Sequence, residues 1–127
     1  MHEKRIEVRW RDVDNYGHVN NAVYLTYLEE ARDEWVEGAV GDGGWDFVLA
    51  RVAIDYRREL TQADGVVIAR CALEGLGTSS VRTREELVTE SGELSAEAQA
   101  VLVARDRESG RSRPLTPDER TAFESTA

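Results

Sequence analysis

The stretch WRDVDNYGHVNNAVYLTYLEEAR, residues 10–32, joins a short polar loop to the first turns of an amphipathic helix. Apolar side chains recur here and just beyond at helical spacing, in the order Tyr24, Tyr27, Leu28, Ala31 and Trp35. Asn20 or Asn21 precedes the periodic run, where an asparagine side chain can cap free backbone N–H groups. Gly38 follows the run and is the expected end. The spacing therefore predicts a helix over residues 22–37.

The loop before this helix gathers many polar side chains, among them Asp12, Asp14 and His18. The first N–H groups of a helix lack intrahelical partners and lie in the positive potential of its dipole, so a helix start can stabilise an oxyanion. A turn at Gly17 would fold Asp14 back over the helix start near Asn21. A carboxylate placed there can act as nucleophile or general base on an acyl carbon. The alternative is that Asp14 and the asparagines only satisfy the loop backbone.

This stretch resembles the signature of the 4-hydroxybenzoyl-CoA thioesterase family of hotdog-fold acyl-CoA thioesterases. The matching residues are Arg11, Asp12, Asp14, Gly17-His18-Val19-Asn20-Asn21, Tyr24, Tyr27, Glu30, Ala31 and Arg32. Weaker agreement continues through residues 52–60, 64–65 and 105–106. The resemblance implies that Asp14 attacks the thioester or activates water, and that the N–H of Asn21 contacts the oxyanion. Such hydrolysis needs no metal and no bound cofactor, because coenzyme A enters as the carrier half of the substrate.

Further side chains around the loop are candidates for contacting the substrate. The predicted substrate-binding residues are Tyr16, Gly17, His18, Tyr24, Arg57 and Arg58. Loop hydrogen bonds are the alternative role for His18, core packing for Tyr24, and simple solvent exposure for the two arginines. Glu29 is a reserve catalytic candidate. The resemblance implies that some hotdog thioesterases use a helix glutamate in place of the loop aspartate, and Glu29 lies near that position. Relatives of other subgroups carry a histidine at the position of Asn21, which weakens any inference about the substrate.

Composition limits the possible functions. The chain has 127 residues and a net charge of −9, which suits one domain and argues against nucleic acid as a ligand. Cys71 is the single cysteine, so no intrachain disulfide forms. A zinc site is poorly supplied, because the chain has only this cysteine and two histidines. We expect Cys71 to be a buried small hydrophobe. No apolar run approaches the roughly 20 residues that span a membrane, and no secretory signal is visible, so we expect a cytoplasmic protein.

The remainder of the chain favours β-strands. Alternating or apolar segments predict strands over residues 4–11, 45–58, 66–76, 79–89 and 94–106, and a glycine-rich loop over 38–46. In the first strand Ile6, Val8 and Trp10 are expected on the buried side. One helix cannot cover both faces of such a sheet, so we expect an α+β protein whose antiparallel sheet curves around the helix. The resemblance names this the hotdog fold, a five-stranded curved antiparallel sheet wrapped around one central α-helix.

The C-terminal residues and the sheet edges complete the prediction. Thr116 as a cap and Pro117 in the first turn predict a short helix near residues 118–124. We expect one hotdog domain over residues 1–127, with 107–127 as a peripheral or partly disordered tail. The resemblance implies a homodimer or homotetramer with shared active sites, and the edges of an open sheet also need pairing or protection.

The function that best fits these features is hydrolysis of an acyl-CoA thioester. A hotdog dehydratase is an alternative, although the His-Phe-Pro-Gly run of those enzymes is missing. A non-catalytic acyl-thioester-binding protein and a structural subunit are the others, and the intact Asp14 with its GHVNN run favours the enzyme over both. The sequence leaves four points open: the acyl group and its length, coenzyme A against acyl carrier protein, nucleophile against general base, and dimer against tetramer.

Overall fold

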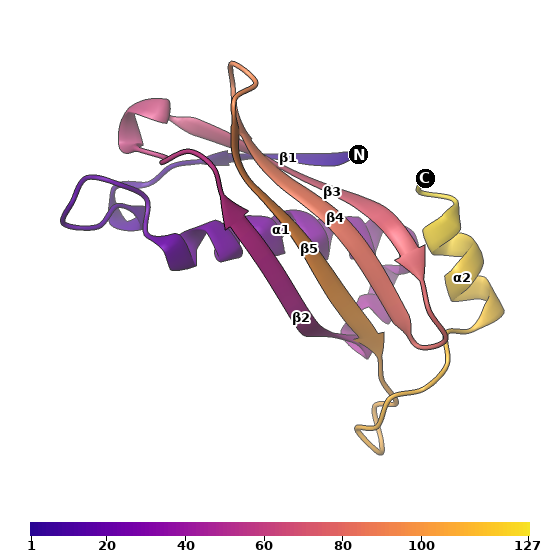
Figure 1. Cartoon of the computed structure of the whole chain (residues 1–127). Coiled ribbons are helices and arrows are strands. Elements are labelled where there is room, and N and C mark those ends of the chain that lie inside the picture. The colour runs from indigo at the N-terminus through magenta and orange to yellow at the C-terminus, as the bar shows by residue number, and fades with distance from the viewer.

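A computed structural model of residues 1–127 shows a five-stranded antiparallel sheet curved around one long helix (Figure 1). The sheet order is β1-β3-β4-β5-β2. Its strands are β1 (His2–Glu7), β2 (Phe47–Tyr56), β3 (Val66–Leu76), β4 (Ser80–Thr89) and β5 (Leu94–Ala104). The helices are α1 (Asn21–Val40) and α2 (Pro117–Glu124), and three short 3₁₀ turns are η1 (Trp10–Asp12), η2 (Gly41–Asp46) and η3 (Gln62–Asp64). This is the predicted α+β arrangement.

The central helix α1 begins as predicted and ends later than predicted. The side-chain oxygen of Asn20 accepts a hydrogen bond from the N–H of Ala22 and caps the helix. Gly38 does not end it, because this glycine keeps helical geometry at a cost of only about 1 kcal/mol relative to alanine. The end comes at Gly41, whose φ of 60° is a left-handed conformation that favours glycine. The glycine-rich segment that follows is the 3₁₀ turn η2 and not an irregular loop.

Strand β1 is shorter than predicted, and Trp10 does not belong to its buried side. Ile6 and Val8 are buried as expected, but the strand ends at Glu7. The carboxylate of Asp12 accepts a hydrogen bond from the N–H of Arg9 at 3.0 Å and closes the turn η1. This turn leaves Trp10 78% exposed.

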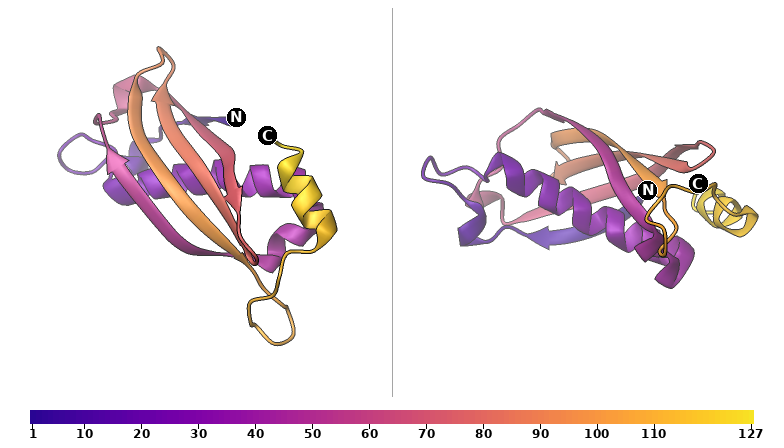
Figure 2. Two further views of the ribbon diagram at one scale, coloured as in Figure 1. Left: turned by 45° about the vertical axis from the view of Figure 1, so that its right-hand side comes forward. Right: turned by 90° about the horizontal axis from the view of Figure 1, so that it is seen from below.

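The core lies between α1 and the concave face of the sheet. One cluster surrounds the first half of α1 and includes Tyr27, Leu28 and the small β5 residues Ala96 and Ala98. The backbone of α1 comes nearest to β3, β1 and β4 and stays farther from β2. The views in Figure 2 show the helix lying along the sheet with β2 at its flank.

A second cluster surrounds the last turns of α1 and includes the C-terminal tail. Helix α2 begins at Pro117 with Thr116 as its cap, as predicted. Its Phe123 is fully buried, with ring centroids 5.4 Å from Trp35 and 5.4 Å from Phe47. Phe123 therefore attaches this part of the tail to the core, while the other residues of α2 stay exposed or partly exposed. No helix in the chain is both long and apolar enough to cross a membrane.

A buried ion pair fastens the middle of α1 to the sheet. Arg32 on α1 and Glu85 on β4 meet through two hydrogen bonds of 2.8 and 2.9 Å. Thr83 donates to the same carboxylate at 2.5 Å, and the thiol of Cys71 lies 3.9 Å from it. Burial alone would lower the pKa of Arg32, but the hydrogen bond and charge of Glu85 outweigh it, and that pKa is raised. Burial also raises the pKa of Cys71, which is buried as predicted.

Candidate active site

The polar loop between η1 and α1 is a tight turn built on Asp14. The N–H of Asp14 donates to the carbonyl of His18 at 2.8 Å, and Val13 and Val19 form a bridge across the loop. One carboxylate oxygen, Oδ1, accepts from the N–H of Tyr16 at 2.9 Å and from that of His18 at 3.3 Å. Gly17 makes the turn possible with a φ of 83°. Tyr16 and Gly17 lie exposed at the tip.

The second carboxylate oxygen of Asp14 has no partner within the chain. Both backbone bonds from the loop go to Oδ1, and no protein group donates to Oδ2. The side chain is half-buried. Loop closure and chemistry were alternatives at the sequence level, but the geometry lets one oxygen close the loop while the other remains available to a substrate or a water.

The first turn of α1 has one N–H that no group in the chain uses. Asn20 donates its own N–H to the carbonyl of Asp12 at 2.9 Å and accepts from Ala22 and Val23. Asn21 comes next, and neither a loop carbonyl nor a side chain accepts from its N–H. This N–H lies at the positive end of a 20-residue helix. An oxygen that gains negative charge would be stabilised there.

Tyr56, which is not among the residues predicted from the sequence, also reaches the helix start. Its hydroxyl donates to the carbonyl of Asn21 at 2.9 Å, and its side chain stays 43% exposed. Its ring packs edge-on against Tyr24 with centroids 5.0 Å apart. The available signal was an aromatic residue at the end of a long apolar strand, which says nothing about the element it will contact.

Tyr24 holds the segment after β2 against the helix. Its hydroxyl accepts from the N–H of Leu60 at 2.8 Å and donates to the carbonyl of Arg58 at 3.2 Å. Burial is the main cause that raises the pKa of Tyr24. Both hydrogen-bonding functions of the hydroxyl are therefore used within the chain. If Tyr24 contacts the substrate as predicted, it does so through its ring.

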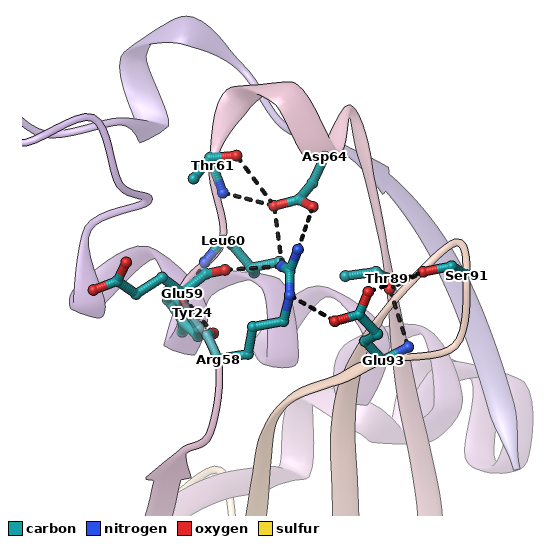
Figure 3. A network of polar contacts seen from close by, with 9 residues as sticks. All are labelled: Tyr24, Arg58, Glu59, Leu60, Thr61, Asp64, Thr89, Ser91 and Glu93. Atoms are coloured by element: carbon teal, nitrogen blue, oxygen red, sulfur yellow. Dashed lines mark hydrogen bonds and ion pairs between the residues drawn. The ribbon is translucent and has the colours of Figure 1, made fainter.

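Arg57 and Arg58, two of the predicted substrate-binding residues, are both paired with carboxylates. Figure 3 shows the guanidinium of Arg58 between Asp64, at 3.1 Å, and Glu93, at 3.0 Å. The hydrogen bond that Arg58 donates to Asp64 is the main cause that raises the pKa of Arg58. Arg57 lies 2.7 Å from Glu97. Their charges are thus compensated within the chain, because the turn after β4 and the strand β5 bring acids to them.

His18 connects the Asp14 loop to the segment that precedes η3. Its Nε2 lies 3.0 Å from a carboxylate oxygen of Glu59, and its backbone forms a bridge with Thr61. The neighbouring N–H of Val19 donates to the carbonyl of Leu60 at 2.7 Å. The loop hydrogen bonds foreseen as one role of His18 are therefore present, while its ring remains partly exposed.

Glu29, the reserve candidate, lies away from the loop. It is exposed on α1, eight positions after Asn21, which corresponds to about 12 Å along the helix axis. Within one chain its carboxylate is not part of the Asp14 site. No group of three His, Cys, Asp or Glu side chains comes together in a way that would hold a metal ion.

A cavity of about 470 Å³ opens at the other end of α1, among η2, β2 and β5. Val36, Phe47 and Leu102 are among its apolar lining residues, and Asp33 and Arg105 are among its charged ones. Burial, followed by the charge of Glu29, raises the pKa of Asp33. The glycine-rich segment 38–46, which the resemblance suggested as a cover for an acyl pocket, supplies part of the lining, including Gly41 and Gly44.

The fold and the loop-to-helix site define a hotdog thioesterase, and comparison with known proteins agrees. Residues 8–123 match the family model of the thioesterase-like superfamily. The chain belongs to that superfamily. The resemblance read from the sequence, the hotdog fold and the enzyme class of thioester hydrolase are thereby confirmed.

Three relatives show the range of this likeness. The chain is 31% identical over 110 residues to the long-chain acyl-CoA thioesterase FadM of Escherichia coli, covering 82% of this chain and 83% of FadM. A crystal structure of a Thermus thermophilus thioesterase complexed with coenzyme A and Zn matches with a TM-score of 0.89 and 34% identity, covering 98% of this chain and 92% of that one. The acyl-acyl carrier protein thioesterase ATL3 of Arabidopsis thaliana is 30% identical over 89 residues, which are 65% of this chain and 45% of ATL3.

Proposed function

We propose that this protein is an acyl-CoA thioesterase that uses Asp14 and the N–H of Asn21 to hydrolyse acyl-CoA to a free acid and coenzyme A. The observation that carries the proposal is the presence of two groups without a partner in one loop-to-helix segment, the Oδ2 atom of Asp14 and the first N–H of α1. The names of FadM and of the Thermus complex support coenzyme A as the carrier.

In this mechanism the thioester carbonyl oxygen accepts a hydrogen bond from the N–H of Asn21. In the first route, Asp14 Oδ2 attacks the carbonyl carbon, the tetrahedral intermediate expels the thiolate of coenzyme A, and water hydrolyses the mixed anhydride. In the second, Asp14 takes a proton from a water that attacks the carbonyl carbon directly. Asp14 then returns this proton to the sulfur, and coenzyme A leaves as the thiol. Both routes give the same products and need no bound cofactor. Tyr16, Gly17 and His18 lie in the same turn and would contact the substrate from the loop side.

The test is thiol release from a panel of acyl-CoAs by wild type and by Asp14→Asn. Asparagine keeps a side-chain oxygen for the N–H groups of Tyr16 and His18, so the loop stays closed while the charge and the free carboxylate oxygen are lost. We expect turnover to fall by about 10²–10⁴-fold with an unchanged melting temperature. Unchanged turnover would move the catalytic role to Glu29 or elsewhere. Binding of acyl-CoA without thiol release by the wild type would instead favour the non-catalytic acyl-thioester-binding protein.

An acyl carrier protein is the second candidate for the carrier half, and the name of ATL3 favours it. The same panel presented on acyl carrier protein measures the preference directly. A hotdog dehydratase gains no support, because the His-Phe-Pro-Gly run of those enzymes is missing and the ring of His18, the histidine of the loop, is paired with Glu59. A cytoplasmic location remains a prediction from the sequence.

We further propose that the chain forms a homodimer or homotetramer through the free edge of β2. The sheet has two edges, β1 and β2. The β1 edge is short and carries charged side chains, including Glu3, Lys4 and Arg5, which disfavour strand pairing. Strand β2 has ten residues, and most of them are apolar. Of the two edges, β2 is the one suited to pairing with a second copy.

A further inference from the structure

Five apolar side chains form a continuous strip along the concave face of β2. The register pairs them with the inward-facing residues of β5, and directly paired residues share a face of the sheet. A bulge between Leu49 and Arg51 keeps the alternation in phase at both ends. The β2 strip consists of Phe47, Leu49, Val52, Ile54 and Tyr56. Ile54 packs against the first core cluster and Phe47 against the second, which places the strip on the side of α1.

This β2 strip is accessible because α1 does not cover it. The helix backbone lies closest to β3, β1 and β4. Leu49, near the middle of the strip, is 45% exposed, and the other members are at least partly accessible. In the view from below, β2 and α1 converge at the turn η2 that connects them (Figure 2). An apolar surface therefore follows the flank of the helix.

The two ends of the β2 strip have different surroundings. Tyr56 donates a hydrogen bond to the carbonyl of Asn21, so this end lies at the proposed oxyanion site. Phe47, at the opposite end, lines the cavity of about 470 Å³ together with Val36 and Leu102. Trp45 forms another wall of this cavity and is 79% exposed. The strip thus connects the site of thioester chemistry to a partly apolar cavity.

The length of α1 sets the distance between these ends. Asn21 and Asp33, the first cavity residue on the helix, are twelve positions apart, and Val36 is three positions farther. At 1.5 Å per residue these separations are about 18 Å and about 22 Å along the axis. An extended chain advances roughly 1.2 Å per covalent bond, since three backbone bonds span at most about 3.6 Å. Reaching the cavity from the helix start therefore takes roughly 15–18 bonds.

We infer that the acyl chain of the substrate lies along the β2 strip and that the cavity at η2 receives its methyl end, so that the enzyme selects long acyl chains of about 14–18 carbons. This inference rests on the proposed function. Chains of about eight carbons end beside Val52 and leave the cavity empty. Only long chains then gain binding energy from methylenes buried in the cavity. Each such methylene raises the ratio of kcat/KM for long over short chains by about tenfold or more.

The first test measures kcat/KM for acyl-CoAs of graded length in wild type, Leu49→Trp and Ala53→Trp. Leu49 lies on the strip, whereas Ala53 pairs with Gln99 and faces away from α1 on the same strand. A tryptophan is well tolerated in a strand at either position. We expect Leu49→Trp to lower kcat/KM for long chains by at least about tenfold while short chains react as before. Ala53→Trp should change neither.

A uniform loss across all lengths in Leu49→Trp, or no change at any length, would overturn the inference. A wild type that releases no thiol from any acyl-CoA would instead defeat the proposed function. The two failures are therefore distinguishable, and a second measurement does not depend on turnover.

The second test locates the chain end with brominated palmitic acids, because bromine quenches tryptophan fluorescence at contact distance. Trp45 lines the cavity, and Trp45→Phe identifies its share of the signal from the three tryptophans. We expect bromine at the terminal carbon to quench Trp45 and bromine beside the carboxylate to leave it unchanged. Equal quenching by both acids, or by neither, would contradict the inference. A strip covered by a second copy in place of the acyl chain would give no quenching.

Discussion

The carboxylate of Asp14 shows how one residue can close a loop with one oxygen and keep the other oxygen free. Its Oδ1 atom fixes the turn through two backbone N–H groups, and its Oδ2 atom stays without a protein partner. Asp12, two positions earlier, is buried, whereas Asp14 is half-buried, and the Oδ2 of Asp12 accepts from the hydroxyl of Tyr27 at 2.6 Å and from the N–H of Arg9. The two adjacent acids therefore have separate roles, Asp12 holding η1 against the helix and Asp14 remaining available.

At the same scale, Asn21→Pro removes one N–H and leaves the helix able to form. Proline is favoured in the first position of a helix. It also requires an extended residue before it, and Asn20 already has φ −59° and ψ 138°. We expect kcat for acyl-CoA hydrolysis to fall by about 10²–10³-fold, the usual effect of losing one oxyanion donor. Steady-state kinetics beside circular dichroism measures both activity and folding.

The matched control is Asn21→Ala, which keeps the N–H and should retain near-normal turnover. Near-normal turnover in a folded Asn21→Pro variant would show that the oxyanion contact lies elsewhere.

At the scale of elements, α1 is attached to the sheet by apolar packing and by the ion pair between Arg32 and Glu85. Both side chains are buried, with 3% and 0% exposed. A buried pair of this kind recovers its desolvation cost only when both partners are present. The pair therefore fixes the position of the helix along the sheet more than it adds to stability.

A double-mutant cycle tests this role of the ion pair. We expect Arg32→Met to lower the free energy of unfolding by about 3–5 kcal/mol, because Glu85 is left buried without its partner. Arg32→Met combined with Glu85→Met should recover most of that loss, since two apolar side chains of similar size replace the pair. Urea denaturation of the wild type and the three variants gives the coupling energy. Additive losses from the two single substitutions would argue against this account.

Helix α2 illustrates how a terminal element joins the core. Its cap at Thr116 is a local signal, but its attachment depends on Phe123 meeting Trp35 and Phe47. Arg113 supports the same helix by donating two hydrogen bonds to Glu119, of 2.8 and 2.9 Å. Hydrogen bonding by Arg113 is the main cause that lowers the pKa of Glu119. The C-terminal residues thus close the end of the fold opposite the Asp14 loop.

At the scale of the whole molecule, the free edge of β2 determines how copies would assemble. Pairing of β2 with β2 of a second copy would continue the sheet across the interface. We expect light scattering to give two or four times the chain mass of 14.2 kDa. Hydrogen exchange should be slow at the outward-facing amides of β2 and fast at those of β1, which stays an edge. A monomer at micromolar concentration, or equal exchange at both edges, would contradict this assembly.

Local patterns in the sequence were enough to predict the elements and to name the candidate site. Helical spacing, the cap at Asn20 and the cap at Thr116 are interactions among residues close together in the chain, so they predicted α1 and α2. Alternation and turn residues likewise predicted five strands, with β3 at the bounds observed. The loop residues that carry Asp14 could be identified because the motif is contiguous.

Which groups of that site are free depends on the folded chain. The pairing of Arg58 with Glu93, the hydrogen bond from Tyr56 to Asn21 and the burial of Phe123 each join residues far apart in sequence. Such contacts depend on the register and curvature of the sheet, which no local pattern specifies. The contiguous motif therefore determines which side chains the loop carries. The tertiary structure determines which of their atoms remain without a partner, because those contacts come from distant parts of the chain.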